Sequence, residues 1–193
     1  MKKTLLLLLL VVIRGYAQEE KSKPINAFYA AGSLEVGNHL GFDVSVNYIY
    51  KNKYSFSLGR LGMLYGSDNY PSDKDDTDGL GFEGIDDAGH IYFSIGRIIE
   101  IKNSDKFRFN LSMGLARTSG YREYNYTRGE KTNNGYYYNS EFEDYHIYSV
   151  ILNPKFEFVK FSASGLYISP KVILNKKKSF YGVGLGLMLG RVR

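Results

Sequence analysis

The sequence predicts an all-β protein, an eight-stranded antiparallel up-and-down transmembrane β-barrel. Three observations support this fold class. Segments of about ten residues alternate apolar and polar side chains, which is the two-residue period of a strand. An apolar N-terminal run marks the chain for export. The connections between the segments are long at one end and short at the other, as in transmembrane barrels.

Residues 1–17 have the pattern of a cleaved signal peptide. Two N-terminal lysines precede an apolar run over 5–13, and small or turn-forming residues follow. This run is about half of the ~20 residues that a membrane-spanning helix needs. We therefore predict a signal peptide over 1–17 and one outer-membrane barrel domain over 18–193.

Composition excludes several classes of function. Removal of Lys2, Lys3 and Arg14 with the signal peptide lowers the formal net charge from +5 to +2. So small a charge gives no basis for nucleic-acid binding. The chain has no cysteine, which excludes disulfides and thiolate chemistry. Its 21 glycines, 18 tyrosines and 12 phenylalanines, against four prolines, favour strands and turns over helices.

The first three strands are predicted over 27–37, 40–50 and 54–66, joined by short connections. The first two alternate without interruption. In the third, the apolar positions change phase near Arg60, and we interpret this change as a β-bulge that turns Arg60 inward.

Five further strands complete the set. Arg97 is the discordant residue on the apolar face of the fourth, and we expect a bulge to turn it inward as well. The turn between the seventh strand and the one before it lies near 162–165. These strands are predicted over 88–101, 106–117, 145–158, 166–174 and 180–190.

The connections decide which face meets which solvent. Short turns follow the second and fourth strands, whereas long loops over 67–87 and 119–144 follow the third and fifth. The long loops therefore lie together at the external end. Aromatic residues gather near both strand ends, as in interfacial girdles. They are Tyr48, Tyr50, Tyr54, Phe107 and Phe109 at the periplasmic end and Tyr65, Tyr145, Tyr148 and Tyr181 at the external end. We infer that the apolar faces meet lipid.

This pattern resembles the small eight-stranded outer-membrane barrels of the OmpX, OmpA and opacity-protein kind, also called porin-like outer-membrane β-barrel domains. The resemblance covers the whole mature chain, and the composition looks like that of Bacteroidota proteins. Gly182, Leu185 and Leu187 fit part of the usual assembly signal in the last strand, although the terminal "GRVR" lacks its aromatic residue. The resemblance implies a monomer that contacts outer-membrane lipid, lipopolysaccharide and the barrel-assembly machinery.

The polar faces predict a charged network in the lumen. Eight strands enclose an interior that side chains just fill, and buried charges must be paired. We therefore expect a plugged polar interior, with a narrow pore as the alternative. The predicted network residues are Glu35, Asp43, Asn47, Glu100, Arg108, Lys155, Glu157 and Lys171.

The loop over 67–87 holds eight acidic residues and one lysine, Lys74. Calcium is one interpretation, because hard cations bind carboxylates. The EF-hand spacing fails, since Ile85 stands where the bidentate Glu belongs. A solvated acidic loop is the other interpretation, and we expect no other cofactor. The candidate ligands are Asp73, Asp75, Asp76 and Asp78.

The loop over 119–144 is rich in Tyr, Asn, Gly and Ser, a composition familiar from binding surfaces. Alternatively, its tyrosines extend two strands into a hairpin that turns at "TNNGY". Both interpretations can hold together. The candidate partner-binding residues are Tyr121, Tyr124, Tyr126, Tyr136, Tyr137 and Tyr138.

We expect a non-enzymatic outer-membrane barrel with a structural or surface-interaction role. The alternative is a lipid-modifying hydrolase or acyltransferase at the rim. His39, His90 and His146 lie near external strand ends, but their positions along the strands do not make them converge. The sequence holds no nucleophile elbow or zinc motif. A soluble lipocalin-like barrel would need an apolar lumen, which the charged inward faces do not offer.

Overall fold

The computed structural model describes residues 26–66, 70–74, 85–101, 106–131, 133–161 and 163–192, with only the backbone described at 65, 85, 160 and 161. The predicted signal peptide over 1–17 lies outside this part. No helix in the described ranges is long and apolar enough to cross a membrane. The strands are β1 Ala27–Gly37, β2 Leu40–Tyr50, β3 Tyr54–Gly66, β4 Ile85–Glu100, β5 Phe107–Lys131, β6 Tyr136–Leu152, β7 Lys155–Phe161, β8 Ser164–Leu174 and β9 Phe180–Arg191.

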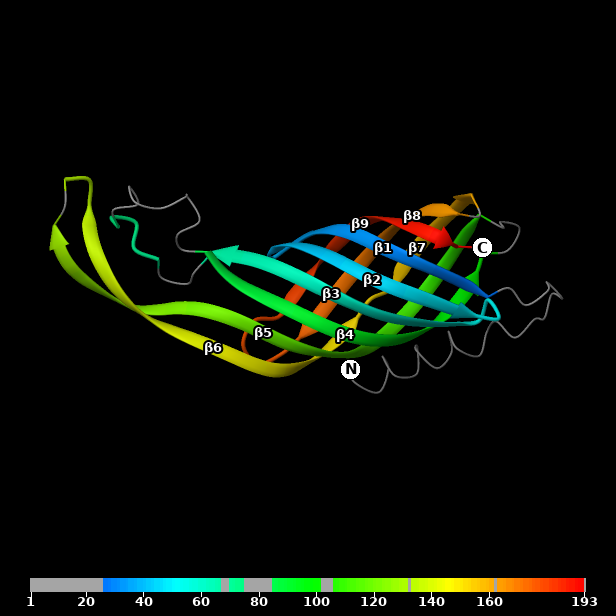
Figure 1. Cartoon of the computed structure of the whole chain (residues 1–193), viewed down its shortest axis with the longest axis horizontal. Coiled ribbons are helices and arrows are strands. Elements are labelled where there is room, and N and C mark those ends of the chain that lie inside the picture. The colour runs from blue at the N-terminus through cyan, green and yellow to red at the C-terminus, as the bar shows by residue number, and fades with distance from the viewer. Residues whose placement is uncertain are drawn as a thin grey trace, which may run out of the picture.

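All of these strands belong to one antiparallel sheet that closes into a barrel, because β1 pairs with both β2 and β9 (Figure 1). β6 and β7 are two parts of one strand of the wall, since both pair with β5 on one side and β8 on the other. The break falls at Asn153 and Pro154, where proline has no N–H for the ladder. The ring therefore has eight wall strands, as predicted, but the strand expected over 145–158 is divided.

The barrel wall is apolar outside and largely polar inside. In β2, buried and exposed residues alternate along the whole strand. Asp43 and Asn47 are buried there, whereas Phe42 and Val44 are exposed. Where β1 pairs with β9, the paired residues Leu34 and Leu185 are 63% and 65% exposed. This arrangement reverses that of a soluble barrel and matches the predicted alternation.

The predicted bulge near Arg60 is wrong. β3 pairs with β2 and β4 in continuous register, so Arg60 stays on the outer wall and is exposed. The apolar residues that follow it, Leu61 and Met63, point inward instead and join a buried cluster with Phe180. The apparent phase change thus reflects an apolar layer inside the external end of the lumen.

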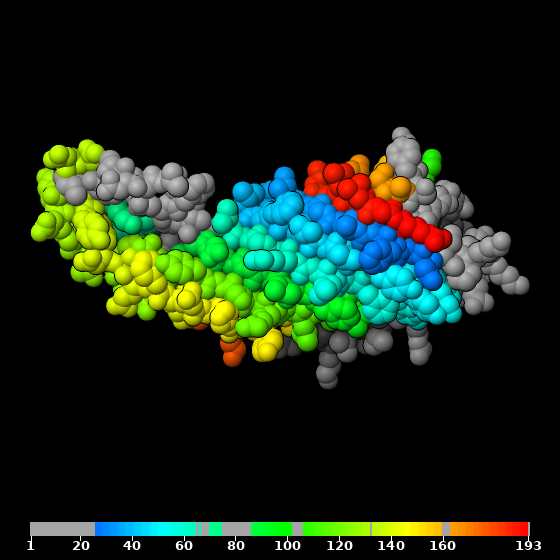
Figure 2. Space-filling view, in the orientation of Figure 1, coloured from blue at the N-terminus to red at the C-terminus, as the bar shows by residue number. Residues whose placement is uncertain are grey.

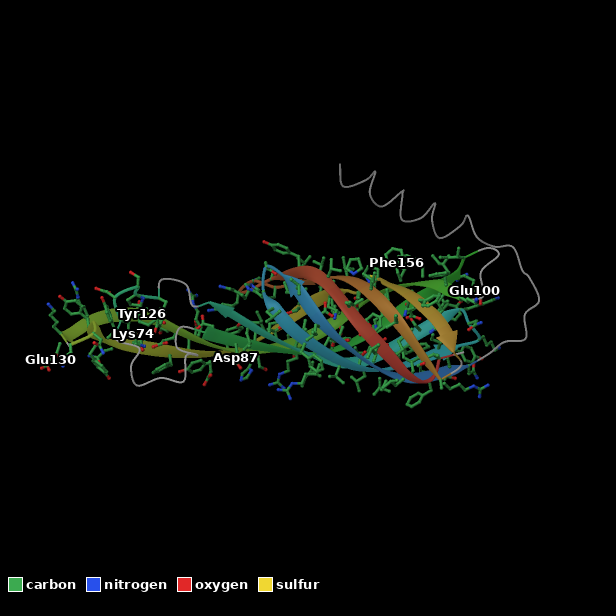
Figure 3. The ribbon with its side chains drawn as sticks, turned by 90° about the horizontal axis from the view of Figure 1, so that it is seen from above. Lys74, Asp87, Glu100, Tyr126, Glu130 and Phe156 are labelled. Carbon is green, nitrogen blue, oxygen red and sulfur yellow. The ribbon has the colours of Figure 1, made fainter. Side chains whose placement is uncertain are left out.

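Three further predicted positions are also wrong. Arg97 is exposed on the outer wall, with its guanidinium 5.6 Å from the centroid of the Tyr54 ring. Glu100 is exposed at the predicted periplasmic end, where β4 ends, and it accepts a hydrogen bond from Asn52 (2.9 Å) (Figure 3). Tyr145 is buried in the lumen and therefore cannot belong to an external girdle.

β5 and β6 continue far beyond the barrel as a hairpin (Figures 1 and 2). The hairpin interpretation of the second long loop is therefore confirmed. Irregular pairing between Tyr124 and Thr127 and between Arg128 and Lys131 interrupts its ladder. Residues 70–74 lie along its outer part, where Lys74 forms a parallel bridge with Tyr136. We call the described residues of this hairpin between Tyr121 and Asp144, together with residues 70–74, the external platform.

Candidate functional site

A buried ion triad occupies the lumen. Lys171 of β8 donates to Glu35 of β1 and to Asp43 of β2, both at 2.6 Å between the nitrogen and oxygen atoms. All three side chains are at most 1% exposed. Tyr92 of β4 donates to both Asp43 oxygens (2.9 and 3.0 Å), and Ser33 donates to Glu35 (2.6 Å). The two carboxylates thus share one cation and additional neutral donors.

A second charged group lies nearer the predicted periplasmic end. Arg108 forms an ion pair with Glu157 and donates to the carbonyl oxygen of Val192 (2.8 Å). Tyr29 donates to the same carboxylate from across the lumen (2.9 Å), and Asn110 contacts it at 3.3 Å. Glu157 therefore connects β1, β5 and β7, which fixes the wall strands relative to one another.

The lumen is bridged from wall to wall. Lys155 in β7 and Asn47 in β2 lie on opposite sides of the ring, and the Lys155 nitrogen donates to the Asn47 side-chain oxygen at 3.1 Å. Ser57 donates to the same oxygen (2.6 Å). These two side chains meet inside the barrel and occupy space that a pore would need. The geometry therefore supports a plugged interior.

The structure places seven of the eight predicted network residues inside the barrel and Glu100 outside. Arg108 and Lys171 form ion pairs with the inward carboxylates of Glu157, Glu35 and Asp43, whereas Lys155 donates a hydrogen bond to the Asn47 side chain. Paired and hydrogen-bonded charges inside a narrow barrel are consistent with a structural network.

Sequence analysis missed the lumen tyrosines. Tyr92 pairs directly with Gly59, Tyr145 with Gly120, and Tyr167 with Gly186. A Cβ atom built on Gly59 or Gly186 would lie 2.5 Å from the facing ring. These glycines therefore make room for large rings in a lumen of fixed width. The available signal was a tyrosine on a polar face opposite a glycine on the neighbouring strand.

In the external platform, Asp73 binds the hairpin. It accepts hydrogen bonds from Arg128 (2.9 Å) and Tyr138 (2.8 Å), and its backbone carbonyl accepts from the N–H of Tyr136 (2.9 Å). The bond to Asp73 raises the pKa of the Tyr138 hydroxyl above its ordinary value. Tyr70 adds an edge-to-face contact with Tyr126, with ring centroids 5.8 Å apart. Asp73 thus serves to dock residues 70–74 on the hairpin.

The other predicted calcium ligands, Asp75, Asp76 and Asp78, lie outside the described residues. Within the described ranges, no group of three or more His, Cys, Asp or Glu residues is arranged to hold a metal. The calcium hypothesis stays a prediction.

The predicted partner-binding tyrosines divide between docking and exposure. Tyr126, Tyr136 and Tyr138 contact residues 70–74, as described above, and Tyr136 also stacks under the Arg128 guanidinium (3.4 Å to the ring centroid). Tyr137 is 60% exposed. At the base of the hairpin Tyr121 stacks on Phe142, an exposed side chain, with centroids 5.3 Å apart. Tyr124 lies between these groups and is half-buried.

The three histidines do not form one site. His90 is buried in the lumen and its Nδ1 lies 2.7 Å from Thr118 Oγ1. His146 is exposed on the outer wall, with Nδ1 3.1 Å from Ser119 Oγ. His39 lies in the turn between β1 and β2. The three imidazoles thus belong to the lumen, the outer wall and a turn.

Known structures share this architecture. No family model and no curated protein sequence matches the chain. The N-terminal β-barrel domain of Pseudomonas aeruginosa OprF is similar, with a TM-score of 0.55, 8% identity, and coverage of 84% of this chain and 96% of that chain. Ail, the attachment invasion locus protein of Yersinia pestis, is similar with a TM-score of 0.50, 11% identity, and coverage of 85% and 97%. The chain therefore has the fold of the small eight-stranded outer-membrane barrels.

Proposed function

We propose that this protein is a non-enzymatic outer-membrane barrel that holds the external platform above the membrane as a binding surface for another protein. The long hairpin of β5 and β6 carries this proposal. It continues beyond Asp87 and Tyr121, the last pair in the ladder between β4 and β5, so its outer part adds nothing to closure of the wall. A signal peptide over 1–17, passage through the barrel-assembly machinery and a monomeric state in lipid belong to the same proposal.

The platform has the chemistry of a protein-binding surface. Tyrosine gives large contact area at a small cost in conformational entropy. Tyr137 and the Tyr121–Phe142 stack present aromatic area to solvent, and aromatic residues are enriched where proteins bind one another. Arg128 is already engaged by Asp73 and Tyr136, so this part of the platform is ordered before a partner arrives. Preorganisation lowers the cost of binding.

The hairpin can be removed without cutting the wall. Tyr124 and Glu141 face each other in the ladder, so replacing residues 125–140 by Asn-Gly gives a two-residue hairpin turn in the same register. We expect the trimmed barrel to keep its heat-modifiable gel mobility and its resistance to protease. Loss of folding in this variant would mean that the hairpin is part of the barrel's structure and would contradict the proposal.

Binding itself is tested with a photo-cross-linking amino acid placed at position 137 in the full chain on living cells. We expect a discrete protein adduct from this position, and no such adduct from the matched position 148 on the outer wall, where Tyr148 is 85% exposed. The variant Arg128→Ala should weaken the adduct by releasing residues 70–74. The same adducts from both positions, or none from position 137, would contradict a binding role for the platform.

A further inference from the structure

The outer wall of the barrel carries a groove floored by small residues. Gly62, Gly89 and Ser119 are consecutive partners across β3, β4 and β5, and all three belong to the outward-facing set. A Cβ atom built on Gly62 would meet nothing within 4 Å, and one on Gly89 would meet a single carbonyl oxygen at 4.0 Å. The groove has a volume of about 580 Å³, and Leu34 and Phe42 line one end of it. The two glycines of the floor leave this space unfilled.

Two arginines border the groove on the side of the membrane centre. Arg60, Ile91 and Arg117 form the row next to the floor, and Arg60 also lines the groove. Both guanidinium groups are exposed, and neither makes an ion pair with any residue in the described part of the chain. An outward charge on a lipid-facing wall is costly, so such residues usually have a functional reason.

The external border of the groove has the opposite chemistry. Leu64, Asp87 and Tyr121 form the row beyond the floor, and Asp144 continues it on β6. Both aspartates line the groove, together with the hydrogen-bonded pair of His146 and Ser119. Asp87 lies where the wall meets the base of the hairpin (Figure 3). The groove is therefore basic toward the membrane centre and rich in hydrogen-bond acceptors toward the outside.

We propose that this groove binds one phosphorylated glycolipid of the outer leaflet. Its phosphates bind Arg60 and Arg117, whose Cα atoms are two strand spacings apart, roughly 10 Å. Its sugar lies on the floor of Gly62 and Gly89 and donates hydroxyl groups to Asp87 and Asp144. Its acyl chains pass between the arginines and descend along β4.

The acyl path is apolar along its length. Ile91 separates the two arginines, and below it Phe93 and Ile95 continue the same outward face of β4, each at least 50% exposed. The carboxylates at the external border favour a sugar headgroup over a simple anionic phospholipid, because carboxylates accept hydroxyl donors but repel a second anion. This proposal rests on the proposed outer-membrane location.

The full chain is tested in phosphatidylcholine nanodiscs titrated with bisphosphorylated lipid A, with dephosphorylated lipid A and phosphatidylglycerol as comparison ligands, and bound lipid is counted by native mass spectrometry. Insertion is established first by heat-modifiable gel mobility. Failure to insert would contradict the membrane location itself. Insertion with equal binding of all three lipids would overturn the groove proposal alone.

Three variants test the residues. Arg60→Gln and Arg117→Gln should each weaken lipid A binding roughly tenfold or more, because each removes a charge-assisted hydrogen bond to phosphate. Gly62→Leu places a side chain on the floor, where a Cβ atom meets nothing within 4 Å, and should weaken binding similarly. Arg97→Gln, on the outer wall near the periplasmic end, is the matched control and should leave binding unchanged.

Arg60→Gln should also insert into plain phosphatidylcholine at least as well as the wild type, which separates binding from folding. Wild-type affinity in the Arg60, Arg117 and Gly62 variants would overturn the proposal.

Discussion

The substitution Lys171→Met should destabilise the barrel by about 3–5 kcal/mol, because it leaves the buried carboxylates of Glu35 and Asp43 without their shared cation. Methionine is unbranched and only one atom shorter than lysine, so the change removes charge and hydrogen bonds more than volume. The free energy of unfolding is measured by urea titration of the protein in lipid vesicles, with folded and unfolded forms separated by gel mobility.

Two controls separate this triad from an ordinary ion pair. Lys177→Met removes a pair with Glu143 in which both side chains are about 40% exposed, and we expect a loss of less than about 1 kcal/mol. The triple variant Lys171→Met, Glu35→Gln, Asp43→Asn should recover most of the stability lost in Lys171→Met, since no uncompensated charge remains. Equal losses from Lys171→Met and Lys177→Met would show that the lumen network does not hold the barrel together.

Replacing Leu185 by arginine should impair assembly in the membrane. Leu185 is 65% exposed at the middle of β9, and its partners on the neighbouring strands, Leu34 and Ile168, are also apolar and exposed. A charge on this face near the bilayer centre costs about 2–4 kcal/mol. The amount of folded protein in the outer-membrane fraction measures the effect.

Leu185→Phe is the matched control and should assemble normally, because it keeps the face apolar. The contrast with the natural Arg60 is informative. Arg60 adjoins the glycine floor of a groove, whereas Leu185 is bordered by large apolar side chains that leave a guanidinium no such space. If Leu185→Arg accumulated like the wild type, the outer wall would not be facing lipid.

Strand positions and faces could be predicted because a strand has a fixed two-residue period, and a slip of one residue would exchange every face. The bounds of the first three strands match the sequence pattern for this reason. Arg60 and Arg97 were misplaced because the outer wall was assumed to be wholly apolar, so each charge was assigned a bulge that the continuous register excludes.

Long-range partners could not be predicted. The contact of Tyr92 with Asp43 depends on register across β2, β3 and β4, and the docking of Asp73 on Arg128 depends on how far the hairpin extends. Periodicity describes one strand at a time and carries no information on either. The groove floored by Gly62 and Gly89 was missed for the same reason, since these glycines become neighbours only through pairing of β3 with β4.

Lipid-dependent folding is the most direct test of the inside-out barrel. Urea-unfolded protein lacking residues 1–17 is diluted into buffer alone and into buffer with phospholipid vesicles, and folding is followed by circular dichroism and by heat-modifiable gel mobility. An apolar outer wall with a charged, plugged interior predicts β-structure and a mobility shift with vesicles, and aggregation without them. A stable, monomeric, folded protein in buffer alone would contradict this interpretation.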